Sequence, residues 1–325
     1  MIWSIKTITG MSSELPLVSV CTITYNHERY IAQAIEGVIN QKCNFRFEMV
    51  IGEDGSKDKT RAIIEEYAAK YPDIIVPLFA EKNQGAKANA TNSLMNCRGK
   101  YIAFLEGDDY WTDPTKLQRQ FDFLEANPDY IMCFTRVAVI DENGDPATDP
   151  YPEFTREDFS FDDIVRAEKC FIPTPTMFFR NILPRPLPEF YVNAMSGDIA
   201  MHLLLSDKGK LKCLPGKTGI YREHPGGITK TEKAKKESYR ELFKLYAKVN
   251  EYFDFRHDKV IRERLLQMSK IKLIFGSKDL KGLEKLKYVR QNASDYFKYA
   301  DRRNIKEMVY YATLLFFPSL LKLKK

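Results

Sequence analysis

No stretch of this 325-residue chain offers the ~20 consecutive apolar residues that a membrane-spanning helix needs. Cysteine pairs are missing too: the six cysteines lie 22 to 54 residues apart, none forms a C-x-x-C pair, and several sit in apolar runs such as VCTI and IMCF. This pattern argues against a disulfide framework or a zinc site and indicates small core side chains in a reducing compartment. We therefore expect a cytoplasmic protein.

The N-terminus also lacks a targeting pattern. Residues 1–17 contain one lysine and no sustained apolar run, so they make a poor secretory signal. Because a second methionine stands at position 11, it stays open whether residues 1–10 are an upstream start that carries no structure.

Charge is distributed unevenly along the chain. Residues 229–325 contain 25 Lys and Arg against 12 Asp and Glu, and subtraction from the totals of 50 and 44 leaves 25 against 32 in residues 1–228. An acidic front part and a basic tail suggest different tasks. We expect the chemistry in the front part, whereas the tail either meets an anionic surface or is a solvated helical face.

Strand and helix patterns alternate from residue 17 to residue 141. Strand patterns cover residues 17–25, 45–54, 74–81, 101–109 and 130–141, and helical periodicity covers residues 29–41, 57–72, 88–97 and 113–128. The last helix has Asp113 as its expected N-cap and Pro114 at its first position. This alternation predicts a parallel sheet wrapped by helices, with ligands bound at the carboxyl ends of the strands.

The regular alternation stops at residue 141. Pro- and acid-rich sequence fills 141–160, and the next elements are a helix near 161–168, a strand near 176–181, a helix beginning at 196, and a strand with a loop over 211–228. From about residue 230 the sequence is helical, rich in lysine and almost free of Pro and Gly. We therefore expect a domain over residues 15–229 and a basic helical region over residues 230–325.

Polar clusters follow three of the predicted strands. These clusters are Thr24-Tyr25-Asn26-His27-Glu28, Glu53-Asp54-Gly55-Ser56 and Glu106-Gly107-Asp108-Asp109. Strand ends are often polar simply because they meet water, but in a parallel sheet these three tips share one edge and can converge on one ligand. Acids beside an anionic pyrophosphate would repel it unless a cation lies between them. The clusters therefore favour Mg²⁺ or Mn²⁺ together with a nucleotide diphosphate.

Five segments of the chain resemble glycosyltransferase family 2, the inverting enzymes of GT-A fold, of the kind that assemble bacterial surface polysaccharides. They are PLVSVCTITYNHERYIAQAIEGVINQ, EMVIGEDGSKDKT, NQGAKANATNSLMNCRGKYIAFLEGDDYW, SGDIAMHLLLSDKGK and GIYREHPGGIT, in the family's order. The resemblance covers about residues 15–229. It implies an α/β fold with a mainly parallel sheet flanked by helices, a nucleotide-sugar-binding half at 15–140 and an acceptor-binding half at 141–229.

The resemblance also implies roles for single residues. Asp54 would bind the nucleoside base, usually uracil, and Asp108 matches the last acid of the D-x-D metal motif. Glu106 stands where that motif usually has its first Asp, a departure in length though not in charge. Trp111 could support the floor of the sugar site, but packing is the better interpretation. The implied nucleotide-sugar site comprises Thr24, Tyr25, Asn26, Glu28, Asp54, Asn83, Gly85, Asn89, Glu106 and Asp109.

Asp198 matches the family's catalytic base. Ser196 can cap the helix that Asp198 opens, and a helix N-terminus favours the ionised carboxylate that a base needs. An Asp in a first helical turn is, however, also simply a good helix starter. His224 would approach the metal or the diphosphate, or else be a surface residue, and Arg222 could pair with phosphate. The remaining histidines, interpreted as structural or exposed, are His27, His202 and His257.

The resemblance implies an enzyme that moves a sugar from a nucleotide-sugar, expected to be a UDP-sugar, to a hydroxyl of a saccharide or lipid-linked acceptor. The implied reaction inverts the configuration of the sugar and depends on Mn²⁺ or Mg²⁺. One alternative is a nucleotidyltransferase, although TYNHERY after the first strand lacks the glycines of a phosphate loop. Another is a non-catalytic module that binds nucleotides or nucleic acid. Because the basic tail has no recognition motif, we expect no nucleic acid.

The end of the basic tail contains a segment that could bind a membrane surface. Residues 308–321 form a 14-residue, mainly apolar segment bounded by lysines, too short to span a bilayer. It could lie in the membrane interface with the lysines on anionic headgroups, which would place the protein peripherally at the inner face of the membrane. It could equally be a closing core helix kinked at Pro318.

Overall fold

The computed structural model describes residues 3–5, 15–227, 232–276, 280, 282–299, 309 and 313. The chain divides into two compact units, Met1–Thr231 and Glu232–Lys325.

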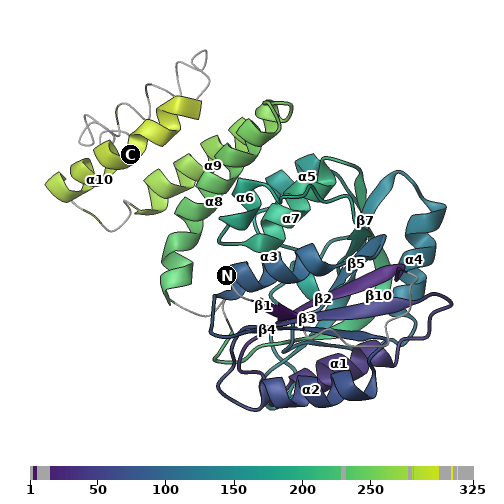
Figure 1. Ribbon diagram of the computed structural model, residues 1–325. Coiled ribbons are helices and arrows are strands. Elements are labelled where there is room, and N and C mark those ends of the chain that lie inside the picture. The colour runs from purple at the N-terminus through teal and green to yellow at the C-terminus, as the bar shows by residue number, and fades with distance from the viewer. Residues whose placement is uncertain are drawn as a thin grey trace. The chain divides into compact units, whose positions relative to one another are not determined.

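A mixed sheet forms the centre of the first unit (Figure 1). Its strand order is β1-β4-β3-β2-β5-β9-β7-β10-β6, and β8 pairs with β10. The strands are β1 (Trp3–Ile5), β2 (Val18–Thr24), β3 (Phe47–Glu53), β4 (Ile75–Ala80), β5 (Tyr101–Phe104), β6 (Tyr110–Trp111), β7 (Tyr130–Ile140), β8 (Asp158–Phe159), β9 (Phe178–Arg180) and β10 (Lys210–Arg222).

The predicted parallel core is present. Strands β4, β3, β2 and β5 run parallel to one another, and β7 runs parallel to β10. The strand predicted near 176–181 is β9, which lies antiparallel between β5 and β7 and separates two strands that the alternation alone would have made neighbours. β1 pairs with β4, Trp3 opposite Ala80, so part of residues 1–10 does have regular backbone structure.

Helices cover both faces of the sheet. Figure 1 shows α1 and α2 on one face and α3 on the other. Helix α1 buries Ile31, Ala34, Ile35 and Val38, whose spacing forms the apolar stripe expected from the sequence. The helices of this unit are α1 (Ile31–Ile39), α2 (Thr60–Lys70), α3 (Ala86–Asn96), α4 (Lys116–Ala126), α5 (Phe161–Arg166), α6 (Glu189–Val192) and α7 (Gly197–Ser206).

Two expected helix caps are wrong. Helix α4 begins at Lys116 with Thr115 at the N-cap position, because the Asp113 carboxylate instead accepts hydrogen bonds from the Thr115 backbone N–H at 2.8 Å and its hydroxyl at 2.7 Å. That local bond closes a turn before the helix starts. Ser196 does occupy the N-cap position of α7, but its side chain makes no capping hydrogen bond.

A buried carboxylate, that of Glu48, ties two of the parallel strands together and pairs with the partly exposed Arg98. The Glu48 carboxylate, on β3, accepts a hydrogen bond from the Ser19 hydroxyl of β2 at 2.7 Å and from Arg98 Nε at 3.0 Å. The six cysteines are all free, as predicted, and Cys21, Cys97, Cys133 and Cys213 are buried.

The second unit is helical, as predicted, with α8 (Glu232–Tyr252), α9 (Asp258–Gly276) and α10 (Gly282–Tyr299). Its buried side chains include Leu245, Val249, Ile261 and Leu265. None of the helices in the described part of the chain is long and apolar enough to cross a membrane. Apart from positions 309 and 313, the predicted interfacial segment 308–321 lies outside the described residues.

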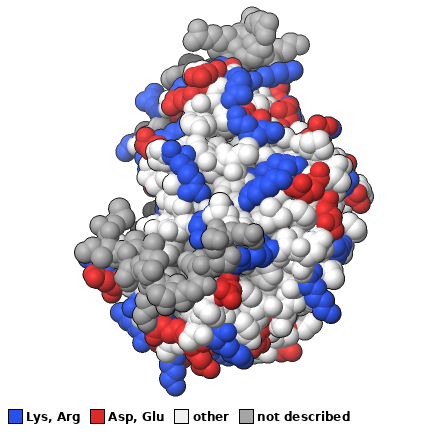
Figure 2. All heavy atoms as spheres, turned by 45° about the vertical axis from the view of Figure 1, so that its right-hand side comes forward, with Lys and Arg blue, Asp and Glu red and all other residues white. Residues whose placement is uncertain are grey.

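Lys and Arg side chains do not gather into one area on the face of the molecule shown in Figure 2. Among the residues drawn in colour there, they stand beside acidic side chains or are separated by uncharged surface.

Candidate active site

The carboxylate of Asp108 and two imidazoles meet beyond the carboxyl end of β5. His224 Nε2 lies 2.9 Å from Asp108 Oδ2, and His27 Nε2 lies 3.7 Å from the same oxygen. Ligand atoms of the three residues all lie within 4.8 Å of one another. Burial opposes ionisation of Asp108, but the hydrogen bond from His224 and the two neighbouring imidazoles outweigh it and lower the pKa of Asp108.

Hydrogen bonds from Asp109 and Arg222 hold this cluster in place. The buried Asp109 carboxylate accepts a hydrogen bond from the Arg222 backbone N–H at 2.8 Å, which fixes the end of β10 two residues before His224. The Arg222 guanidinium donates to the Asp108 backbone carbonyl at 3.1 Å and to Gln33 Oε1 at 2.9 Å. It also lies over the ring of Tyr30, 4.7 Å from the ring centroid. The predicted phosphate partner Arg222 therefore has structural partners in this arrangement.

Glycine at position 107 allows the β2 and β5 tips to approach each other closely. A Cβ atom on Gly107 would lie 2.7 Å from Thr24 Oγ1 and 3.2 Å from His27 Nδ1. Any other residue would push the two strand tips apart. The cluster of Asp108 and the two imidazoles therefore requires glycine at position 107.

Two acids of the β5 tip, Glu106 and Asp109, have raised pKa values. Glu106 Oε2 is buried and has no hydrogen-bond partner within the described residues. Burial, with the charges of Asp108 and Asp198, raises the pKa of Glu106 to about 8. Burial and the charges of Asp108 and Glu106 likewise raise the pKa of Asp109 well above its usual range. The Asp108 carboxylate and the two imidazoles beside it are a set of donors that fits a divalent cation.

Asp198 reaches the same site from a distant part of the chain. It is half-buried in the first turn of α7, close enough to Glu106 for its charge to act on that carboxyl group. The Cys170 thiol donates to the Ile172 carbonyl at 3.5 Å, and burial together with the charge of Asp198 raises the pKa of Cys170 far above its usual range. One turn along α7, burial lowers the pKa of His202 to about 4, so His202 is a neutral core residue at pH 7.

The residues predicted at the β2 tip bind the loop that follows β3. Asn26 has a positive φ of 55°, and its Oδ1 accepts a hydrogen bond from the Lys57 N–H at 2.8 Å. Glu28 accepts a hydrogen bond from the Lys59 N–H at 2.9 Å. Thr24 is buried and Tyr25 is half-buried. These contacts join two of the three strand tips that the sequence predicted to converge.

Asp54 is bonded to the start of α3. Its two carboxylate oxygens accept hydrogen bonds from the backbone N–H groups of Gln84, at 2.8 Å, and Gly85, at 2.9 Å. Burial, which opposes its ionisation more than these two hydrogen bonds favour it, raises the pKa of Asp54. Gly85 has a φ of 91°, which suits the turn before the helix. Asn83 is exposed on the same loop.

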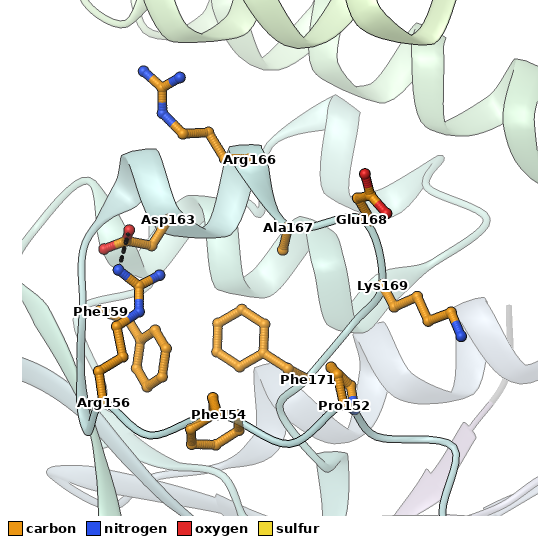
Figure 3. A pocket seen from close by; sticks show the side chains of 10 residues that line it. All are labelled: Pro152, Phe154, Arg156, Phe159, Asp163, Arg166, Ala167, Glu168, Lys169 and Phe171. Carbon is orange, nitrogen blue, oxygen red and sulfur yellow. Dashed lines mark ion pairs between the residues drawn. The ribbon is translucent and has the colours of Figure 1, made fainter. Parts of the chain in front are cut away.

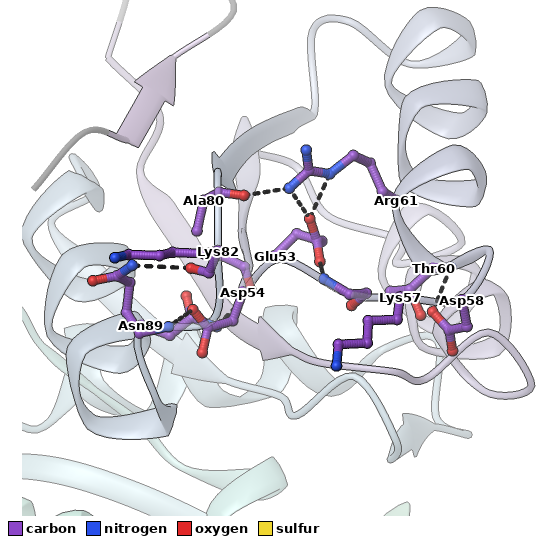
Figure 4. A network of polar contacts seen from close by, with 12 residues as sticks. Glu53, Asp54, Lys57, Asp58, Thr60, Arg61, Ala80, Lys82 and Asn89 are labelled. Carbon is purple, nitrogen blue, oxygen red and sulfur yellow. Dashed lines mark hydrogen bonds and ion pairs between the residues drawn. The ribbon is translucent and has the colours of Figure 1, made fainter.

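Asn89 and Glu53 lie beneath this surface (Figure 4). The Asn89 amide is buried and donates to the Gly52 carbonyl at 2.8 Å. The fully buried Glu53 carboxylate accepts hydrogen bonds from the Ser56 N–H at 2.5 Å and Arg61 Nε at 2.6 Å. Both side chains shape the loops of the candidate donor site from below, with their polar groups already bonded within the protein.

A pocket of about 440 Å³ lies in the 141–229 half (Figure 3). The rings of Phe154, Phe159 and Phe171 line it, and on one side Arg156 pairs with Asp163 at 2.7 Å. Phe171 directly follows Cys170, the residue that contacts Asp198.

Sequence reasoning missed His27 as a member of the cluster. We interpreted it as structural or exposed, yet it lies beside Asp108 and its side chain is only 17% exposed. The feature of the sequence that could have indicated this role is the position of His27 in the same strand-tip cluster as Thr24 and Asn26. Trp111 packs in the core, as predicted, and its Nε1 donates to the Pro175 carbonyl at 2.6 Å.

The fold and the site define an α/β domain with a mixed sheet of GT-A-like type and a cluster of acids and histidines at the carboxyl edge of that sheet. Residues 19–183, just over half of the chain, match the family model described as "Glycosyl transferase family 2". The chain belongs to this family. Membership of a glycosyltransferase family favours sugar transfer over the nucleotidyltransferase and the non-catalytic binding module.

Relatives of known sequence agree with this membership. An uncharacterized protein of Mycobacterium tuberculosis is 36% identical over 211 residues, 65% of this chain and 60% of that protein. An uncharacterized glycosyltransferase of Methanocaldococcus jannaschii is 38% identical over 46% of this chain and 50% of its own length. The putative teichuronic acid biosynthesis glycosyltransferase TuaG of Bacillus subtilis is 34% identical over 42% of this chain and 52% of its own. The chain thus spans about 60% or less of these relatives.

Solved structures share the fold. S. aureus TarS 1–349 in complex with UDP-GlcNAc superposes with a TM-score of 0.65 at 18% identity, covering 88% of this chain and 82% of that one. The mannosyltransferase PcManGT of Pyrobaculum calidifontis, in complex with GDP-Man and Mn²⁺, gives a TM-score of 0.51 at 14% identity, covering 96% and 91%. At these identities the likeness shows the GT-A-like fold.

Proposed function

We propose that this protein transfers a sugar from a nucleotide-sugar, a UDP-sugar, to a hydroxyl of a saccharide or lipid-linked acceptor, with inversion and with Mn²⁺ or Mg²⁺ as cofactor. The observation that carries the proposal is the cluster of Asp108, His224 and His27 at the tip of β5. Asp198, in the first turn of α7, lies near enough for its charge to contribute to the raised pKa of Glu106. A base facing a cation-binding diphosphate site is the arrangement that a sugar transfer by direct displacement needs.

The donor would lie along the shared edge of β2, β3 and β5. On this proposal the Thr24–Glu28 tip, the loop of Asn83 and Gly85, and the acids Glu106 and Asp109 form its binding surface. Asp54 would meet the base while its two backbone hydrogen bonds hold the loop before α3. Asn89 would support this surface from beneath, since its amide is buried against Gly52. The complexes of TarS with UDP-GlcNAc and of PcManGT with GDP-Man support a nucleotide-sugar in this fold.

Asp108 and His224 would hold the cation. The residues fit such an ion because the Asp108 carboxylate and the His224 imidazole nitrogen lie within ligand distance of one another. When bound, a divalent cation would offset the negative charge that develops on the departing diphosphate. The Mn²⁺ in the PcManGT complex supports this assignment.

Asp198 would accept the proton of the acceptor hydroxyl as that oxygen attacks the anomeric carbon. A carboxylate acts as a base only when it is ionised. Asp198 lies half-buried in the first turn of α7. The attack would come from the face opposite the leaving group, which gives inversion.

The acceptor would bind on the side of residues 141–229. The aromatic pocket of Phe154, Phe159 and Phe171 is our candidate for its outer part, because Phe171 adjoins the residue that contacts Asp198. An acceptor in surface-polysaccharide synthesis agrees with the name of the relative TuaG. Peripheral binding to the inner membrane face through the basic tail remains part of the proposal for a lipid-linked acceptor.

A panel of nucleotide-sugars tests the proposal. The full chain is incubated with each donor plus Mn²⁺, and release of nucleoside diphosphate is measured with and without chelator. We expect slow, metal-dependent hydrolysis of one UDP-sugar, lost in Asp108→Asn. Hydrolysis that is unchanged by chelator and by Asp108→Asn would overturn the metal-dependent mechanism.

A further inference from the structure

We infer that His27 is a third protein ligand of the divalent cation, so that this chain offers two imidazoles and one carboxylate and selects Mn²⁺ over Mg²⁺. The inference rests on the proposed function, in that it assumes a cation at Asp108. It goes further by giving a role to His27 and by predicting which of the two metals the chain uses.

The spacing of the three side chains supports a common ion. Any three atoms within 4.8 Å of one another fit inside a circle of about 2.8 Å radius, a little longer than metal–nitrogen and metal–carboxylate bonds of about 2.0–2.2 Å. Small rotations of the rings close the difference. His27 Nε2 is 3.7 Å from Asp108 Oδ2, which is too far for a hydrogen bond but is a natural separation for two ligands of one ion.

The His27 side chain lacks the partners that a buried imidazole normally has. Its Nδ1 is buried with no hydrogen-bond partner in the part of the chain that the structure describes. Burying an imidazole without hydrogen bonds costs free energy. A cation bound at Nε2 would not bond Nδ1, but the metal–nitrogen bond would offset the free energy that burial of the ring costs. The two imidazole rings meet edge to face, with centroids 5.9 Å apart, so both can face one point without overlapping.

The backbone of His27 is rigidly held, as a metal ligand requires. Its N–H donates to Thr60 Oγ1 at 2.8 Å, and its carbonyl accepts hydrogen bonds from the N–H groups of Tyr30 and Ile31, each at 2.9 Å, at the start of α1. Because Gly107 packs against the His27 ring, the ring is also held from the side of β5. The geometry therefore exists before any ion binds.

The donor set decides the metal. Mg²⁺ prefers oxygen ligands and keeps several waters, whereas imidazole suits transition metals, and affinity for a nitrogen-containing site rises from Mn²⁺ onward through the first row. Two imidazoles beside one carboxylate thus favour Mn²⁺. A site that used only Asp108 and a diphosphate would discriminate little between the two ions.

Calorimetry of the full-length protein tests the selectivity. Mn²⁺ and Mg²⁺ are titrated, with and without UDP, into wild type, His27→Gln and the matched control His257→Gln, which lies outside the cluster. We expect His27→Gln to weaken Mn²⁺ binding at least tenfold and to lower the Mn²⁺ to Mg²⁺ preference, while His257→Gln matches wild type. Equal Mn²⁺ affinity in His27→Gln and the control would overturn the inference.

Pulsed electron paramagnetic resonance of bound Mn²⁺ gives a readout that keeps the native His27. In His224→Gln a directly bonded nitrogen should still couple to Mn²⁺, and the coupling should vanish in the His27→Gln/His224→Gln double variant. Loss of all nitrogen coupling in His224→Gln alone would overturn the inference. This is also the result expected if His27 only donates a hydrogen bond to phosphate and does not bind the metal. If the wild-type protein does not bind Mn²⁺ either with or without UDP, the proposed metal-dependent function itself would be contradicted.

Discussion

His224 Nε2 and Asp108 Oδ2 lie 2.9 Å apart although 116 positions separate the two residues in the sequence. The contact joins the tip of β5, in the half that we propose binds the donor, to the loop after β10. It depends on the pairing of Asp109 with the Arg222 backbone, which sets where β10 ends. One hydrogen bond between a strand tip and a returning strand therefore positions the proposed metal ligands.

Replacing Asp109 tests this positioning role. Asp109→Asn keeps an oxygen that can accept the hydrogen bond from the Arg222 N–H, whereas Asp109→Ala leaves that buried N–H unpaired. We expect Asp109→Ala to weaken Mn²⁺ binding about tenfold or more, and Asp109→Asn to stay within a few-fold of wild type. Calorimetric titration of Mn²⁺ in the presence of UDP makes the comparison. Equal losses in both variants would show that the charge of Asp109, and not its hydrogen bond, is what matters.

Replacing the proposed base should separate chemistry from binding. Asp198→Asn removes proton acceptance but keeps the size of the side chain, so transfer should fall about 10²–10⁴-fold while UDP affinity in Mn²⁺ stays within a few-fold. Asp162→Asn, on the exposed surface of α5, is the matched control and should transfer normally. Near-normal turnover by Asp198→Asn would mean that Asp198 is not the base.

Removing Arg61 should destabilise the protein without touching the site chemistry. Arg61 is the charged partner of the fully buried Glu53 and also donates to the Ala80 carbonyl at 2.5 Å. Arg61→Met leaves the Glu53 carboxylate buried with less compensation, which we expect to cost about 3 kcal/mol of unfolding free energy. Urea unfolding measures the loss, with the exposed Arg166→Met as control. A loss below that of the control would contradict the assigned role.

Lys116 should make stability depend on pH. It is fully buried, its Nζ donates to Gln120 Oε1 at 2.7 Å, and burial lowers the pKa of Lys116 to about 7. Between pH 7 and 10.5 the unfolded chain binds a proton that the folded chain does not, so the free energy of unfolding rises with pH. The slope from this group is at most about 1.4 kcal/mol per pH unit.

Lys116→Met removes that titration. The variant should be more stable than wild type at pH 7, and the gap should narrow as the pH rises toward 10, as measured by urea unfolding at several pH values. A gap that stays constant between pH 7 and pH 10 would mean that Lys116 is charged in the folded protein.

The alternation of strands and helices was predictable because each element carries its own periodicity. The burial of Ile31, Ala34, Ile35 and Val38 in α1 follows directly from their spacing. The insertion of β9 between β5 and β7 was not predictable, because a short apolar run such as Phe178–Arg180 pairs with whichever edges the rest of the fold leaves open. The predicted start of α4 at Asp113 was wrong because the Asp113 carboxylate bonds to Thr115 in a local turn, whereas α7 begins after Ser196 as predicted.

The strand-tip acids of the site could be predicted from the sequence, because carboxylates that directly follow buried apolar strands indicate a ligand or cation that offsets their charge. The neighbours of Asp198 could not be predicted from the sequence. Asp198 comes near the Cys170 thiol and Glu106 only when residues 141–229 fold over the β5 tip. His27 was missed for a related reason. Its role depends on the nearness of Asp108 and His224, which are far away in the sequence, and the sequence signal was its place in the strand-tip cluster with Thr24 and Asn26.

Binding of UDP measured by calorimetry, in Mn²⁺ and then in chelator, tests most directly whether the acid and histidine cluster holds a metal-bound diphosphate. We predict that wild type binds UDP in Mn²⁺, that chelator abolishes the binding, and that Asp108→Asn weakens it at least tenfold. Binding of UDP with the same affinity in chelator, or by Asp108→Asn as tightly as by wild type, would contradict the account.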